Sequence, residues 1–184
     1  IVITDGYEGG KAVVEYFRGL LLTLKGSSSE AMSVSVKWDG APAVVCGTNP
    51  DNGKFFVGTK SVFAKNAKIN YTKKDIATNH GTEALGQKLL KCLVHLKKLN
   101  IQGVVQGDLL YIDDDITRKN IDGKPNLTFT PNTITYAVPE ASELGKQIDR
   151  AKVGIIFHTT YNGDTLADMS ASGGADVSSF AKSN

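Results

Sequence analysis

Lys37 is the residue whose type and position best suit covalent chemistry in this chain. It ends an apolar run and precedes a turn, in the sequence Val-Ser-Val-Lys-Trp-Asp-Gly-Ala-Pro-Ala-Val-Val over residues 34–45. A lysine at the end of a strand can be held rigidly while its amine points into a cleft, as a lysine nucleophile requires. The same residues also fit a plain hairpin, because Asp-Gly between two apolar runs is a strong turn signal. The motif Lys-x-Asp-Gly is therefore informative only if the rest of the chain agrees with it.

Three candidate residues lie on strand-like segments farther along the chain. Lys60 follows the run Phe-Phe-Val-Gly-Thr, Asp108 interrupts an apolar run, and Tyr136 lies in an alternating run. A carboxylate inside a strand is costly to bury unless it is paired or used in chemistry, which favours a functional role for Asp108. Lys60 fits a ligand contact and a solvated strand end equally well. Tyr136 also fits ordinary sheet packing, in which aromatic residues are favoured.

Other polar residues have simpler interpretations. His158 lies between Phe157 and Thr159, and we expect it to be a hydrogen-bonded histidine within a strand. The run Asp113–Asp115 is predicted to be a solvated loop. The lysines between residues 65 and 98 are interpreted as solvated faces or as a weak path for a nucleic-acid backbone.

Composition excludes several classes of protein. The 184 residues are 41% hydrophobic and 22% charged, with a net charge of +2, which is typical of a globular domain. This charge is too small to indicate nucleic-acid binding without clustering, and only three arginines are available for a phosphate clamp. Cys46 and Cys92 have no metal-ligand spacing, and buried free thiols are favoured over one disulfide. No apolar stretch approaches 18 residues, so we expect no membrane span.

Hydrophobic periodicity predicts an α+β fold, with mostly antiparallel sheets and flanking helices. The hairpin signals and the lack of regular βαβ alternation favour this class over a doubly wound sheet. The predicted helices are 10–24, 82–99 and 140–150, and the predicted strands are 33–38, 42–46, 54–58, 104–111, 127–130, 133–138 and 153–160. Residues 65–80 are predicted to be a long loop or a short helix. We expect residues 1–184 to form one domain with a loose tail over 170–184, and the start at Ile1 indicates a processed form or a piece of a longer chain.

The order of these segments resembles the covalent nucleotidyltransferase superfamily of ATP-dependent DNA ligases, RNA ligases and mRNA capping enzymes. The first motif of that superfamily, Lys-x-Asp-Gly, is matched by Lys37, Asp39 and Gly40. Its second motif in RNA ligases, a strand ending in Ser-Lys-Gly or similar, is matched loosely around Lys60.

The remaining motifs follow in the family's order. The third, an apolar strand ending in Gly-Glu, is matched by Gly107-Asp108, and the aromatic segment after it is matched around Tyr136. The fourth has the shape of Val153-Gly154 followed by an apolar run. The chain most resembles phage-type RNA ligases, and it is also similar to a family of marine-phage proteins.

This resemblance implies that the Lys37 amine attacks the α-phosphate of ATP and forms a lysyl-AMP intermediate. It implies nucleotide contacts for Gly40, Lys60 (ribose or phosphate), Asp108 (ribose) and Tyr136 (base stacking). It also implies Mg²⁺ on the phosphates, with Asp108 or Asp113–Asp115 as candidate donors, and nucleic-acid ends as the partner. The amine must be neutral to attack, so its pKa must fall well below about 10.4. A phage-encoded ligase would act in the cytoplasm of its bacterial host.

Two departures from the family pattern leave alternatives open. Val153 replaces the acidic residue of the fourth motif, and no final Lys-x-Lys pair precedes Asn184. A ligase-like module that binds nucleotide or nucleic acid without catalysis is therefore a second hypothesis, and a structural phage protein with a simple hairpin is a third. The sequence does not distinguish RNA from DNA or ATP from GTP.

Overall fold

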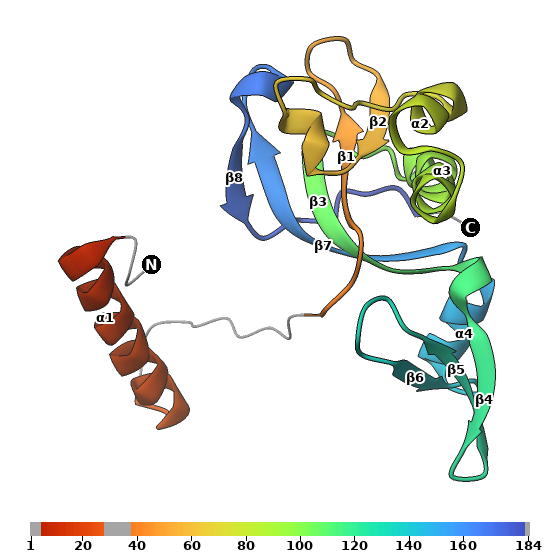
Figure 1. The fold of residues 1–184 in the computed structure, drawn as a ribbon. Helices are drawn as coiled ribbons and strands as arrows, with labels where there is room; N and C mark the ends of the chain where they lie inside the picture. The colour runs from red at the N-terminus through yellow and green to blue at the C-terminus, as the bar shows by residue number, and fades with distance from the viewer. Residues whose placement is uncertain (1–4, 28–37, 183–184) are drawn as a thin grey trace. The chain divides into compact units, whose positions relative to one another are not determined.

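The chain was analysed as a computed structural model, which describes residues 5–27 and 38–182. It separates into two units, residues 1–37 and residues 38–184, and each is described by itself (Figure 1). Lys37 and the predicted strand positions 33–37 lie outside the described residues.

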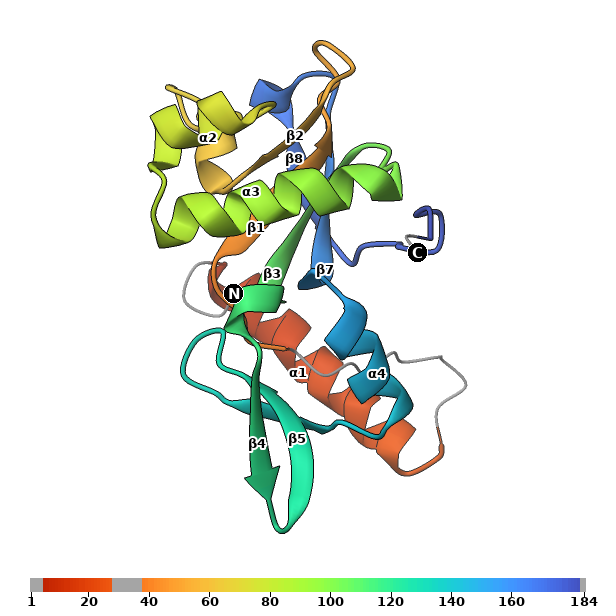
Figure 2. The same cartoon turned by 90° about the vertical axis from the view of Figure 1, so that its right-hand side faces the viewer.

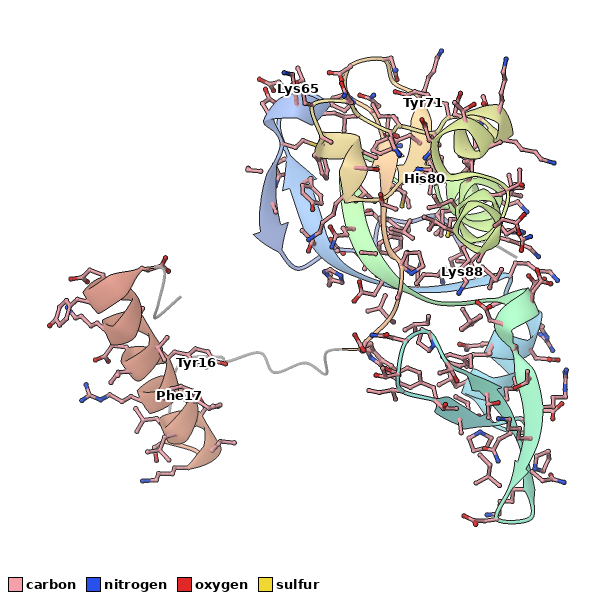
Figure 3. The ribbon with its side chains drawn as sticks, in the orientation of Figure 1. Tyr16, Phe17, Lys65, Tyr71, His80 and Lys88 are labelled. Atoms are coloured by element: carbon pink, nitrogen blue, oxygen red, sulfur yellow. The ribbon has the colours of Figure 1, made fainter. Side chains whose placement is uncertain are left out.

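The first unit contains one helix, α1 (Gly6–Leu24), which confirms the helix predicted over 10–24 and begins it four residues earlier. Its large apolar side chains are mostly exposed within this unit, and Gly9 is its one buried residue in the described part. Tyr16 and Phe17 project from the helix (Figure 3) and pack edge to face, with ring centroids 5.7 Å apart.

The second unit is built on a five-stranded sheet in the order β2-β1-β3-β7-β8, in which every strand pair is antiparallel. Its strands are β1 (Ala43–Thr48), β2 (Phe55–Gly58), β3 (Val104–Ile112), β7 (Val153–Asn162) and β8 (Ser170–Gly173). The central strand β3 is buried along most of its length, so its long apolar run is explained by its place between β1 and β7.

Helices α2 (Lys73–His80) and α3 (Ala84–Leu96) cover one face of this sheet (Figures 1 and 2). The leucine stripe of α3 places Leu89, Leu93 and Leu96 against Val44 and Val105 of the sheet. A short 3-10 turn, η2 (Lys97–Leu99), extends α3 to the end predicted from the sequence. Cys46 and Cys92 are buried here as free thiols, as predicted, and burial raises the pKa of Cys92 to about 12.

The opposite face of the sheet has its own apolar cluster. Val45, Phe56 and Val104 pack there with Val62 from η1 (Lys60–Phe63) and Leu166 from η4 (Leu166–Asp168). Alternate residues of β1 and β3 therefore point into two different cores, as expected for a sheet covered on both faces.

A three-stranded sheet, in the order β4-β5-β6, lies beyond the end of β3. It comprises β4 (Thr117–Ile121), β5 (Lys124–Phe129) and β6 (Tyr136–Pro139), and it packs with α4 (Glu143–Arg150) around Leu127 and Ile148. The 3-10 turn η3 (Asp113–Asp115) connects β3 to this sheet.

The α+β class with antiparallel sheets is confirmed, but two strands differ from the prediction. β4 has no buried residue, so no apolar alternation marks it, and its backbone pairing with β5 alone defines it. β8 lies in the segment expected to be a loose tail; it is also fully exposed and is held by pairing with β7. None of the helices within 5–27 and 38–182 is long and apolar enough to cross a membrane.

Candidate functional site

The segment Trp38–Gly40, which follows Lys37 in the chain, lies directly against β3. A Cβ atom at Gly40 would come 2.7 Å from the carbonyl oxygen of Leu109 and 3.0 Å from Cβ of Asp108. Just after it, the Leu109 backbone N–H donates to the carbonyl of Pro42 at 3.1 Å. Only glycine fits at position 40 without displacing the backbone of β3, so the Asp-Gly pair is more than a turn signal.

Asp39 is held from the other side by the smaller sheet. The Tyr136 hydroxyl lies 3.2 Å from both the backbone nitrogen and the backbone oxygen of Asp39. Asn132 donates its side-chain amide to the Asp39 carboxylate at 3.0 Å. Trp38 packs on the Tyr136 ring with centroids 5.2 Å apart, and Phe129 stacks on the same tyrosine at 5.5 Å. The motif segment is therefore fixed between the two sheets by both its backbone and its side chains.

Asp108 lies on β3 beside this segment and is largely buried, with 16% of its side chain exposed. It is opposite Ala43 on β1 and Ile156 on β7. Its carboxylate contacts Nε2 of His158 at 3.3 Å, and Nδ1 of that histidine lies 2.9 Å from the Thr159 hydroxyl. His158 is hydrogen-bonded to Thr159, which confirms the prediction, and its other ring nitrogen contacts the Asp108 carboxylate.

A β-bulge brings His158 to this place. Gln106 pairs with Thr159 and Gly107 pairs with Phe157, so His158 is the extra residue on β7. Bulges re-aim side chains and are common beside functional sites. Phe157 stays in the core beneath α3, while His158 reaches Asp108.

Val153 occupies a different part of the sheet from Asp108. It pairs with Ile112, which is roughly 13 Å along β3 from Asp108 at about 3.3 Å per residue. An acidic residue at position 153 would therefore not face Asp108, and the polar group that β7 contributes there is His158.

Lys60 is exposed and begins η1 immediately after β2. Gly58 pairs with Val45, and Asp108 pairs with Ala43, so β2 ends at the edge of the sheet where β1 begins and Asp108 lies. In the part of the chain that the structure describes, the Lys60 amine has neither an ion pair nor a hydrogen bond.

The run Asp113–Asp115 is a lysine-paired connection. Lys91 and Lys152 both contact Asp113, and Lys88, labelled in Figure 3, contacts Asp115 at 3.1 Å. The hydrogen bond from Lys91 is the largest of the effects that lower the pKa of Asp113 to about 2. These carboxylates are thus matched by lysines, unlike Asp108.

The structure brings Asp39, Gly40, Asp108 and Tyr136 together, and it places Lys60 at the same sheet edge. The sequence prediction missed Trp38, Asn132 and the role of His158. Trp38 stands within the Lys-x-Asp-Gly motif, and that position was the only sequence signal for it, whereas Pro131-Asn132 between two predicted strands indicates only a turn. No group of three His, Cys, Asp or Glu residues suited to a metal ion occurs within 5–27 and 38–182.

The chain was compared with protein families, curated proteins and solved structures. No curated protein and no solved structure matches it. One family model matches the whole of residues 1–184. The chain therefore belongs to the family described as "Family of unknown function (DUF6267)".

Proposed function

We propose that the chain is an ATP-dependent nucleotidyltransferase of the RNA or DNA ligase type, which forms lysyl-AMP at Lys37 and acts on nucleic-acid ends. The observation that carries the proposal is the hydrogen bonding of Asp39 to Tyr136 together with the close approach of Gly40 to the β3 backbone at Leu109, next to Asp108. These residues come from distant parts of the chain, and their types and order match the superfamily's motifs. A hairpin turn alone gives no reason for such attachment.

In the proposed reaction, the neutral Lys37 amine attacks the α-phosphorus of ATP. A nitrogen–phosphorus bond forms, the bond from that phosphorus to the bridging oxygen breaks, and pyrophosphate leaves. The amine gives its proton to solvent. Lys60, whose charge is not matched by a carboxylate among the described residues, is the proposed phosphate or ribose contact.

Asp108 is the proposed acceptor for a ribose hydroxyl, with His158 fixing the direction of its carboxylate. Tyr136 and Trp38 form the aromatic surface proposed for the base, and stacking of this kind contributes about 1–3 kcal/mol per base. Trp38 is 39% exposed, so its ring has a free surface. Mg²⁺ would supply charge neutralisation on the phosphates and commonly takes one or two protein carboxylates, a number that Asp39 and Asp108 can provide.

Intact-mass spectrometry after incubation with ATP and Mg²⁺ tests the proposal. We expect a mass increase of one AMP, located by peptide mapping to Lys37 and absent in Lys37→Ala. Lys65→Ala is the matched control, because Lys65 is an exposed lysine of the second unit outside the candidate site and should leave labelling unchanged. An unlabelled wild-type chain, or an adduct that persists in Lys37→Ala, would refute the proposal.

A module that binds nucleotide without catalysis is the second candidate. The absence of an acidic residue at Val153 and the pairing of Asp108 with His158 favour it. Calorimetry with ATP would then show binding, and a coupled assay would show no release of pyrophosphate.

A further inference from the structure

A groove of about 660 Å³ lies between the end of α3 and the junction of α4 with β7. Figure 2 shows α3 crossing the sheet, with α4 below it at the start of β7. Three cationic side chains line the groove: Lys98 from η2, Arg150 from the end of α4, and Lys152 just before β7. His95 and Gln147 are its other polar side chains.

Most of these cationic side chains are available to bind an anionic ligand. Lys98 and Arg150 are exposed and form no ion pair within the described residues. Lys152 is partly matched by Asp113, which Lys91 also contacts. The carboxylate that contacts a groove cation, that of Asp113, is therefore already shared between two lysines.

His95 lies among these cations at the end of α3. Its pKa is lowered, first by burial and then by the charges of Lys98, Lys91 and Lys152, with Asp113 alone acting in the opposite direction. At neutral pH this side chain is uncharged and can donate a hydrogen bond to an anion. The cationic surroundings that resist its protonation are those that would attract phosphate.

Leucine and valine side chains form the floor between these cations. Leu96, Leu99 and Val153 line the groove and belong to the core beneath α3. A ligand suited to this surface has closely spaced negative charges along its edge and flat apolar groups to place on the floor. A nucleic-acid strand has both features, whereas a purely acidic polymer such as polyglutamate has only the charges.

We propose that this groove binds the phosphodiester backbone of a single-stranded segment of nucleic acid. The choice of nucleic acid rests in part on the proposed function, but the groove is distinct from the candidate site. Leu109 points into the core beneath α3, as Val153 does, whereas its neighbour Asp108 contacts His158 outside that cluster. The groove would therefore hold part of the strand away from the reacting end.

Fluorescence anisotropy with a labelled single-stranded RNA or DNA oligonucleotide tests the proposal on the full chain. We expect the double variant Lys98→Ala/Arg150→Ala to bind roughly 25-fold more weakly at about 0.1 M salt. Each lost phosphate contact should lower the slope of log affinity against log salt by about 0.7. The control variant Lys54→Ala/Lys119→Ala removes the same charge from two exposed lysines outside the groove and should bind like the wild type.

His95→Gln provides a second measurement. Wild-type affinity should rise as the pH falls from about 7 to 5, because phosphate raises the pKa of His95 towards protonation, and His95→Gln should lose this dependence. Equal effects of the groove and control variants, or wild-type binding to polyglutamate as tight as to the oligonucleotide, would overturn the proposal.

AMP labelling separates this proposal from the proposed function. The groove variant should still be labelled at Lys37. A chain that binds the oligonucleotide through the groove but is never labelled refutes only the ligase chemistry.

Discussion

Two carboxylate groups, Asp108 within β3 and Asp113 just beyond its end, have different charged partners. Asp113 is bonded to two lysines, and neighbouring Asp115 pairs with a third. Asp108 is less exposed than Asp113, yet its one charged or chargeable partner among the described residues is the imidazole of His158. A buried carboxylate without a full counter-charge is costly.

This difference separates a structural carboxylate from a candidate functional one. The lysine-paired cluster ties α3 and the start of β7 to the connection between the two sheets. The Asp108 site, in contrast, is built from glycine, aromatic rings and one histidine, and it leaves a negative charge to be met by a ligand. Four substitutions and one pH titration test this distinction between the two carboxylates.

Asp108→Asn should have the largest effect. It removes the charge while retaining the shape, so we expect AMP labelling to slow about a hundredfold, equivalent to roughly 2.7 kcal/mol. The free energy of unfolding, measured by urea denaturation, should change little. Asp113→Asn should label at the wild-type rate, and the reverse pattern would invalidate the distinction.

Gly40→Ala should come next. The new Cβ would meet a backbone oxygen at 2.7 Å, and no side-chain rotation can relieve that contact. We expect a loss of about 1–3 kcal/mol in unfolding free energy, as for other overpacked sites, with weaker ATP binding. Gly173→Ala is the matched control, because the space around that glycine is open. Similar stability losses in both variants would show that Gly40 is not held against β3.

Asp113→Asn should lower the unfolding free energy at pH 7 by about 1–2 kcal/mol, after allowance for solvent screening of these lysine contacts. Urea denaturation of the variant against the wild type measures it. Asp122→Asn, an exposed acidic residue without an ion pair in the described part, provides the control.

The same carboxylate predicts the direction of acid sensitivity. The pKa of Asp113 is lowered to about 2 from its ordinary value of 3.8, so its stabilisation is nearly complete above about pH 5 and is lost as pH falls through 2. The stability difference between the wild type and Asp113→Asn should shrink across that interval. A difference that stayed undiminished at pH 2 would contradict the ion-pair explanation.

Tyr136→Phe should have the smallest effect. It removes a hydroxyl that contacts both backbone polar groups of Asp39 and retains the stacked ring. We expect a loss of about 0.5–1.5 kcal/mol, seen mainly as a raised KM for ATP in the labelling assay. Tyr71→Phe removes a hydroxyl that bonds Asn49 and Asn52 away from the site, and it should leave that KM unchanged.

Much of the fold could be predicted because its elements follow hydrophobic periodicity. Helix α3 and the central strands bury apolar stripes, so the spacing of their apolar residues predicts them. Strands β4 and β8 have no buried residue, and only their backbone pairing defines them. The local sequence pattern contains no signal for that pairing. The candidate site could be predicted where a residue type is unusual for its secondary structure, as the carboxylate of Asp108 is in an apolar strand. Asn132 and His158 acquire their partners through long-range contacts, so their neighbours in the sequence gave no sign of them.

The bulge at His158 lets one strand contribute to both apolar cores. Phe157 packs in the core beneath α3, whereas Tyr161, four residues later, packs in the core on the opposite face of the sheet. Residues four apart in a regular strand point to the same face, so the extra residue between Phe157 and Thr159 reverses the alternation. A second register shift, between Leu109 and Tyr111 of β3, restores the original offset towards the start of β7. The imidazole of residue 158 therefore belongs to the Asp108 contact, while its presence as an extra residue belongs to the packing of both cores.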